Sequence, residues 1–247
     1  MKKYIIIIAF IVITIFIAIL SNIIDDELDG KTIAFLGDSL IEGYGNEYRG
    51  FEYYMQPSLP NSKFINNSRS GSTVTDNTGT DNIVMLNQVK TLTGQPDIIV
   101  FDGGANDIIG YGLGFLDNAL KKDIGTVNQE KDSMTDKSTV IGDFEEIIVE
   151  LQKKYPNAKL YYLQLFLIDD ETINKITIDE SKKPEMKSRR DKFYSEIKIL
   201  CKKRNVEYLE VANKFIETEK KYRQDDWIHL KEEGYQVLTP YILEKLK

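Results

Sequence analysis

Short apolar runs bounded by turn residues recur along the chain and predict buried β-strands. These runs occupy residues 31–36, 97–101, 160–168 and 206–211, with a weaker run at 63–66. In the clearest of them, such as Ile98-Ile99-Val100-Phe101, the apolar residues are consecutive rather than alternating with polar residues. A strand covered on both faces needs apolar side chains on both, so this pattern predicts a parallel sheet packed between helices.

Segments with apolar residues at helical spacing alternate with the predicted strands. Helices are expected at residues 82–92, 144–155, 186–200 and 231–246. Pro240 lies inside the last of these and predicts a kink or a break, because proline lacks the amide hydrogen that a helix needs. Two stretches without such a pattern, residues 108–139 and 169–183, are predicted to be long irregular connections.

The alternation of strands and helices defines the expected fold class. It implies right-handed strand–helix–strand crossovers and hence an α/β fold, a three-layer α/β/α doubly wound parallel sheet. We expect this fold to occupy residues 30–247 as one domain, a normal size for such a core. In folds of this class the ligand site lies beyond the carboxyl ends of the strands.

The N-terminal residues 1–24 have a different pattern. Lys2 and Lys3 precede an uncharged apolar run over residues 4–20, and acidic residues follow from Asp25. As a helix, residues 4–24 would be roughly 30 Å long, about the thickness of a hydrocarbon core. The lysines predict that the N-terminus stays inside and the body outside the cell membrane. Two readings remain open: an uncleaved single-pass anchor, or a signal peptide whose removal would release a secreted protein.

Composition and charge exclude several classes of protein. Hydrophobic residues make up 42% of the chain, which rules out global disorder. The net charge is −7 and no basic stripe appears, so no nucleic-acid partner is expected. The most basic run, residues 182–192, is predicted to be a solvated helix face. The single cysteine, Cys201, lies in an apolar context and is expected to be a buried thiol.

A candidate base and a candidate nucleophile emerge from the polar residues. His229 is the only histidine, and Asp226 precedes it by three residues, a spacing at which a carboxylate on a turn reaches Nδ1. Asp225 is the reserve choice for that carboxylate. Ser39 follows the first predicted strand directly after Gly37-Asp38, where its hydroxyl is expected to reach the base.

Donors for an oxyanion complete the candidate site. We expect them to be the backbone N–H groups of Ser39 and Gly71 and the side-chain amide of Asn106. These three residues follow the first, second and third predicted strands, respectively. Parallel strands end at the same edge of a sheet, so the three should meet there.

With these blocks in place, the chain resembles the GDSL/SGNH hydrolase family over about residues 31–245. Gly37-Asp38-Ser39-Leu40, Gly71, Gly104-Ala105-Asn106-Asp107 and Asp226-Trp227-Ile228-His229 match four of its motif blocks in order. The resemblance implies a flavodoxin-like SGNH hydrolase fold and ester or thioester hydrolysis with no metal or other cofactor. It also implies Ser39, His229 and Asp226 as the catalytic triad.

The substrate follows from weaker features. The loops expected near the site, 67–82 and 169–183, are rich in polar residues, as is the second half of 108–139. This composition favours short-chain esters, above all O-acetyl groups on extracellular or cell-envelope carbohydrate. Alternatives are a lysophospholipase or thioesterase acting on lipids, an inactive membrane-anchored carbohydrate-binding protein of the same fold, and a metal-dependent hydrolase built on Asp38, Asp102, Asp107 and Asp226.

Overall fold

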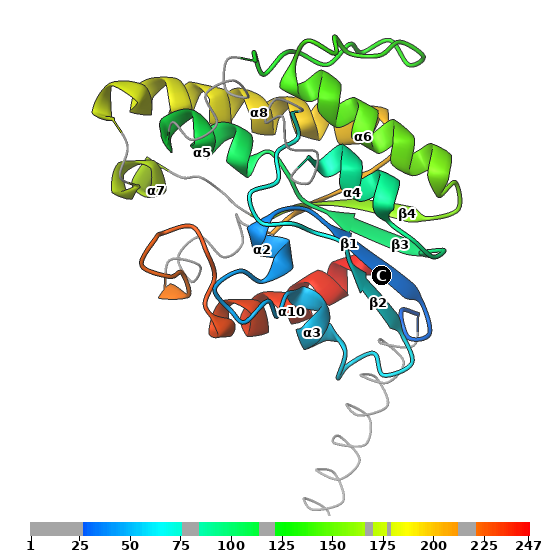
Figure 1. The fold of residues 1–247 in the computed structure, drawn as a ribbon. Coiled ribbons are helices and arrows are strands. Elements are labelled where there is room, and N and C mark those ends of the chain that lie inside the picture. Colours follow the sequence, from blue (N-terminus) through cyan, green and yellow to red (C-terminus); the bar gives the residue numbers. More distant parts are fainter. Residues whose placement is uncertain (1–26, 76–83, 114–121, 166–169, 177–178, 212–220) are drawn as a thin grey trace, which may run out of the picture.

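The computed structural model of the protein describes residues 27–75, 84–113, 122–165, 170–176, 179–211 and 221–247 (Figure 1). At its centre is a parallel sheet of five strands: β1 (Thr32–Leu36), β2 (Lys63–Asn66), β3 (Ile98–Phe101), β4 (Lys159–Gln164) and β5 (Glu207–Glu210). Their order across the sheet is β2-β1-β3-β4-β5. This is the flavodoxin-like order of a doubly wound sheet, which confirms the predicted fold class.

Helices cover both faces of the sheet (Figure 1). On one face lie α4 (Met85–Thr91), α5 (Ala105–Leu113), α6 (Val140–Lys154) and α8 (Lys183–Lys203). The other face carries α3 (Phe51–Met55) and α10 (Glu232–Leu246). The short helix α2 (Ser39–Glu42) directly follows β1. Because the chain leaves β1 for β2 on one side and returns to β3 on the other, the carboxyl ends of β1 and β3 flank the topological switch point.

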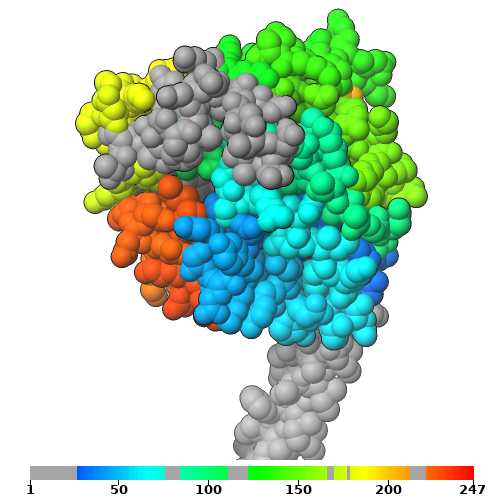
Figure 2. All heavy atoms as spheres, viewed as in Figure 1, coloured from blue at the N-terminus to red at the C-terminus, as the bar shows by residue number. Residues whose placement is uncertain are grey.

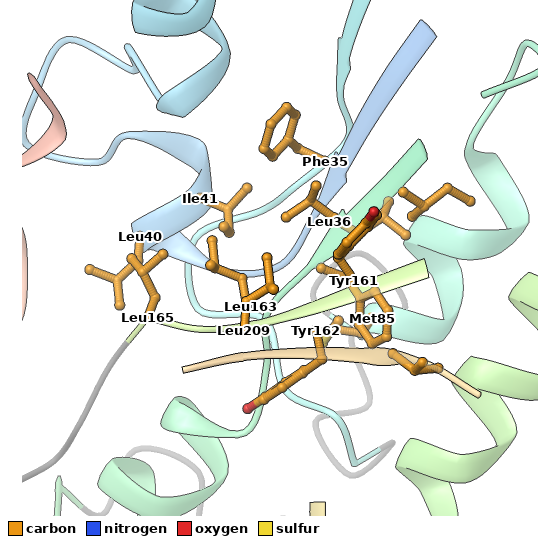
Figure 3. Close-up of a cluster of buried hydrophobic side chains, with 14 of the residues drawn as sticks. Phe35, Leu36, Leu40, Ile41, Met85, Tyr161, Tyr162, Leu163, Leu165 and Leu209 are labelled. Carbon is orange, nitrogen blue, oxygen red and sulfur yellow. The ribbon is translucent and has the colours of Figure 1, made fainter. Parts of the chain in front are cut away.

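The buried core explains which strands the sequence predicts well. Every residue of β3 is buried, and so is every residue of β1 after Thr32. The edge strands β2 and β5 both begin and end with exposed residues, so their apolar runs are short. Figure 3 shows side chains from β1, α2, α4, β4 and β5 gathered in one buried cluster. Cys201 is fully buried, as predicted, and burial raises the pKa of its thiol.

The prediction of two long irregular connections is wrong in part. Residues 108–113 belong to α5, and residues 170–182 contain α7 (Asp170–Lys175) and a 3-10 helix, η3 (Glu180–Lys182). The glycines of α5 and the short polar residues of α7 have low helix propensity, but tertiary packing overrides it. Ile108, Ile109 and Ile173 are almost completely buried. Residues 122–139 contain no helix or strand, as expected.

Pro240 does not break the C-terminal helix, which runs continuously from Glu232 to Leu246. Proline removes the hydrogen bond to the carbonyl of Gln236, four residues earlier. Gln236 and Pro240 both lie on the exposed face, where solvent can satisfy that carbonyl. The predicted break is therefore wrong.

The basic run over residues 182–192 forms part of α8, but the prediction of a fully solvated face is also wrong in part. Lys183 is buried, and its Nζ donates to the carbonyl of Asn174, 3.1 Å away. Arg189 donates from Nη2 to the carbonyl of Lys122 at 3.0 Å. These two side chains therefore attach α7 and the 122–139 segment to the body.

The predicted anchor, residues 1–24, lies outside the described residues. Within the described part, no helix combines the length and apolar character that a membrane span requires. The chain enters the body at Leu28, which is buried and whose carbonyl accepts from Ser62 Oγ at 2.9 Å. Residue 28 lies just before the amino end of β1, at the opposite end of the strand from Ser39.

Candidate active site

The loop after β1 places Ser39 at the carboxyl edge of the sheet. Gly37 has φ +150°, and a Cβ there would lie 2.8 Å from Cγ1 of Ile41, so only glycine fits. Asp38 caps α2 by accepting from the backbone N–H of Leu40 at 3.0 Å. Ser39 then opens the helix, and only 8% of it is exposed.

A tight turn near the C-terminus holds the candidate base. The turn is closed by a bridge between Arg223 and Leu230 and by the N–H of Gln224, which donates to the carbonyl of His229 at 2.8 Å. Asp226 Oδ1 accepts from the backbone N–H groups of Ile228 and His229, both at 2.9 Å. The carboxylate is therefore fixed by the turn that it precedes, as in an Asx turn.

The structure brings Asp226, His229 and Ser39 into one hydrogen-bonded chain. Asp226 Oδ2 lies 2.6 Å from His229 Nδ1, and His229 Nε2 lies 2.9 Å from Ser39 Oγ. It is Asp226, and not the reserve choice Asp225, that occupies the position at Nδ1. Burial tends to raise the pKa of Asp226, but the hydrogen bonds from His229 and Ile228 outweigh it and lower that pKa to about 2. Its carboxylate is thus charged at neutral pH and orients the imidazole.

The candidate oxyanion donors lie beside this chain. Asn106, in the first turn of α5, donates from Nδ2 to the carbonyl of Ser72 at 2.9 Å and to Asp38 Oδ2 at 3.3 Å. Gly71 precedes Ser72 and has φ +78°, in the left-handed region that favours glycine. Glu42 Oε2 accepts from the N–H of Ser70 at 2.7 Å, which ties α2 to the same loop. The three strand ends therefore meet as the sequence predicts.

Sequence reasoning missed Gln88, a buried residue of α4 that joins two parts of the site. Its Oε1 accepts from the N–H of Gly37 at 2.8 Å, and its Nε2 donates to the carbonyl of Gly37 at 2.7 Å. Nε2 also donates to Ser72 Oγ at 2.8 Å. A polar residue between Met85 and Val89 on the buried face of a predicted helix was the available signal.

Arg223 is a second residue that the sequence did not single out. It is buried, and its Nη1 donates to Thr172 Oγ1 at 2.6 Å and to the carbonyl of Trp227 at 3.1 Å. Trp227 has φ +65°, an uncommon conformation for a bulky residue. Arg223 therefore holds the turn of Asp226 and His229 against α7.

Three further carboxyl groups, those of Asp38, Asp102 and Asp107, are buried near the site. Burial raises the pKa of Asp38 to about 6, and burial together with the charge of Asp38 raises the pKa of Asp102 well above its usual range. Burial also raises the pKa of Asp107, although Asp107 accepts from the N–H groups of Val74 and Thr75. These aspartates are structural, since each contacts backbone of the strand-end loops.

These aspartates were also the basis of the metal-site alternative. Within the described residues, no three or more histidine, cysteine, aspartate or glutamate side chains are grouped so that they could hold a metal ion.

Comparison with known families agrees with the motif order. The sequence model of the GDSL-like Lipase/Acylhydrolase family matches residues 35–237, which include all four motif blocks. The chain belongs to the GDSL-like lipase/acylhydrolase family. It is therefore an ester-hydrolysing enzyme.

Solved structures show the same fold at low sequence identity. A Lactobacillus plantarum protein is 17% identical with a TM-score of 0.66, covering 88% of this chain and 97% of its own. A psychrotrophic esterase from a Pseudoalteromonas species is 17% identical with a TM-score of 0.54, covering 87% and 96%. Phospholipase A1 from Streptomyces albidoflavus is 15% identical with a TM-score of 0.55, covering 88% and 99%. A search of curated proteins finds no match to this GDSL-family chain.

Proposed function

We propose that this acylhydrolase is a serine esterase in which Ser39 is the nucleophile, His229 the general base and Asp226 the residue that orients it. The observation that carries the proposal is the continuous hydrogen-bonded chain from Asp226 through His229 to Ser39, with distances of 2.6 and 2.9 Å. Both contacts fall within the reach that proton transfer requires.

The proposed reaction has two steps. His229 Nε2 takes the proton of Ser39 Oγ, which attacks the ester carbonyl and forms a tetrahedral oxyanion. The N–H groups of Ser39 and Gly71 and the side-chain amide of Asn106 stabilise that anion. His229 then gives its proton to the departing alcohol. In the second step His229 deprotonates water, which attacks the acyl-serine and releases the acid and free Ser39.

A fluorophosphonate probe tests the assignment, because such probes label only activated serines. The labelled peptide should contain Ser39, and Ser39→Ala and His229→Ala should each abolish both labelling and esterase activity. The double variant should be little worse than either single variant, since the residues act as one unit. Labelling and turnover at the wild-type level in a folded Ser39→Ala protein would refute the assignment.

For the substrate we propose short-chain O-acyl groups, most of all acetyl groups, on extracellular or cell-envelope carbohydrate. A lipase for long chains would need a broad apolar surface or lid beside its site. Residues 108–139, which could form such a lid, begin with Ile108 and Ile109, and both are almost completely buried in α5. The described residues 122–139 are largely polar.

A lipid acylhydrolase is the second candidate. The similarity in fold to Streptomyces albidoflavus phospholipase A1 is the observation that favours it. A series of p-nitrophenyl esters of increasing chain length separates the two. Highest kcat/KM with acetate, together with acetate release from an acetylated glycan, would support the carbohydrate esterase. An optimum at medium or long chains would support the lipid enzyme instead.

A further inference from the structure

Two exposed tyrosines lie beside the proposed base. Tyr44 and Tyr48 are 44% and 64% exposed and belong to the connection between α2 and α3. The ring of Tyr44 lies against that of His229, with centroids 4.8 Å apart, and Tyr48 meets Tyr44 edge-on at 6.3 Å. In Figure 2 the surface of this segment, in blue, borders that of residues 221–235, in orange. The two rings therefore form an open aromatic surface at the rim of the site.

Backbone hydrogen bonds hold the segment that carries these rings in one conformation. The N–H of Tyr44 donates to the carbonyl of Ser39 at 3.0 Å, and the N–H of Tyr48 to that of Gly43 at 3.1 Å. Asn46 Nδ2 donates to the carbonyl of Arg49 at 2.8 Å.

The same segment holds two residues in an unfavourable conformation. Glu47 and Tyr48 have φ +53° and +57°, which costs energy for non-glycine residues and commonly marks functional segments. Exposed rings held in this way lose little conformational entropy when they bind a ligand.

The position of the rings relative to the reaction identifies the half of the ester they would contact. In the proposed mechanism the carbonyl oxygen points to Asn106, and His229 must protonate the oxygen of the leaving alcohol. The alcohol therefore lies next to His229. Since Tyr44 covers the ring of His229, the aromatic surface adjoins the alcohol and not the acyl group.

We infer that Tyr44 and Tyr48 form a subsite for the alcohol half of the substrate and that the alcohol is a sugar ring. A pyranose presents C–H groups on its face and hydroxyls around its edge. Tyrosine offers a matching apolar ring with a polar tip. Glu47, next to Tyr48, is charged and exposed, which suits hydroxyls better than an alkyl chain. This inference rests on the proposed function and adds the residues that select the alcohol.

The test compares two acetate esters that differ only in the alcohol. The full-length protein is assayed with methyl 6-O-acetyl-glucopyranoside and with ethyl acetate, whose alcohol is too small to cover either ring. Tyr48→Ala should lower kcat/KM for the sugar ester about tenfold, mostly through KM, and change kcat/KM for ethyl acetate less than twofold. Tyr44→Ala should also lower kcat/KM for the sugar ester about tenfold. Tyr44→Phe should keep most of the activity on the sugar ester.

Tyr53→Ala is the matched control, because Tyr53 is also exposed, at 52%, but packs on Tyr54 and Arg49 instead of His229. It should leave both rates unchanged. Tyr48 does not contact His229, so its variant remains decisive even if Tyr44→Ala disturbs the base. Equal losses on both esters in the Tyr48 variant would overturn the subsite and leave the esterase proposal intact. Hydrolysis of ethyl acetate without any hydrolysis of the sugar ester by the wild type would overturn the carbohydrate proposal and the subsite together.

Discussion

At the scale of single residues, Asp226 has the role that the geometry defines most clearly. Its two carboxylate oxygens have different partners: Oδ1 accepts from the turn's N–H groups, and Oδ2 faces His229 Nδ1. In the proposed mechanism the carboxylate selects the tautomer that leaves Nε2 free to accept the proton of Ser39. This arrangement separates its structural contribution from its proposed catalytic one.

Asp226→Asn tests that division. The amide oxygen can still accept from the N–H groups of the turn, so the fold should persist. The uncharged amide nitrogen, which replaces Oδ2, no longer stabilises the protonated imidazole. We expect kcat to fall by roughly 10³–10⁴, by analogy with triads in general. Steady-state kinetics of the two proteins measure the effect, and an unchanged kcat in a folded Asp226→Asn protein would contradict this role. Asp225→Asn is the control and should have near-normal activity.

A second residue-scale prediction concerns the buried carboxyl of Asp38, whose pKa is raised by burial from 3.8 to about 6. Between these values the unfolded chain releases a proton that the folded protein keeps, so stability should decline as the pH rises from about 4 to 6. The decline is at most ~3 kcal/mol, since one pKa unit corresponds to about 1.4 kcal/mol.

Asp38→Asn should remove this part of the pH dependence. Denaturant unfolding at several pH values between 4 and 7 measures it. Burial raises the pKa of Asp102 as well, so Asp102→Asn should also reduce the decline of stability with pH. Parallel curves for Asp38→Asn and wild type would show that Asp38 does not titrate as described.

At the same scale, the sequence predicts those site residues whose chemistry depends on local spacing. Asp226 and His229 are three residues apart, and Ser39 follows a strand, so the sequence pattern indicates them as candidates. Gln88 and Arg223 act through bonds to distant segments, to Gly37 and to Thr172. The distant partners in such contacts are set by tertiary packing, which local spacing does not reveal.

At the scale of elements, the connection between α4 and the end of β1 supports the site. Gln88 satisfies both backbone groups of Gly37 and also binds Ser72 Oγ, so one side chain positions the end of β1 and the Gly71 loop together. A buried polar group that loses its partner typically costs 1–3 kcal/mol.

Gln88→Leu should therefore lower the free energy of unfolding by roughly 2–4 kcal/mol, because it leaves buried polar groups unpaired. It should also lower kcat more than it raises KM, since the oxyanion donors lose their support. Gln88→Glu keeps an acceptor for the N–H of Gly37 but loses the donor, and it should fall between Gln88→Leu and wild type. Lys90→Ala, on the exposed side of α4, is the control. A stable Gln88→Leu protein with normal kcat would rule out this positioning role.

The sequence predicts an element well when nearly all of its residues are buried, because burial gives the element a clear apolar pattern. The strands β1 and β3 are buried nearly throughout, so their apolar runs are unambiguous. The short helices α5 and α7 were missed because glycine and polar residues weaken the local pattern, while their burial depends on α8 and on the site loops. Pro240 led to the opposite error, a predicted break in a helix that is continuous, because an exposed helix face tolerates the missing hydrogen bond.

At the scale of the whole molecule, the chain entry and the site lie at opposite ends of the sheet. Leu28 is packed near the amino end of β1, and Ser39 follows its carboxyl end. The five residues of β1 separate them by roughly 17 Å. If residues 1–24 anchor the protein, the site faces away from the attachment point. An enzyme oriented in this way would reach glycans beyond the membrane more readily than lipids within it, which agrees with the proposed substrate.

The anchor itself is testable in intact cells. Because Lys2 and Lys3 precede the apolar run and acidic residues follow it, the body should lie outside the membrane. Protease added to intact cells should digest the body, and a variant lacking residues 1–26 should remain inside and protected until lysis. Replacing Asp25, Asp26 and Glu27 by lysines should weaken the charge asymmetry that sets this orientation and leave a fraction of the molecules protected. Full protection of the unaltered protein in intact cells, with digestion only after lysis, would place the body inside and remove extracellular carbohydrate from its substrates.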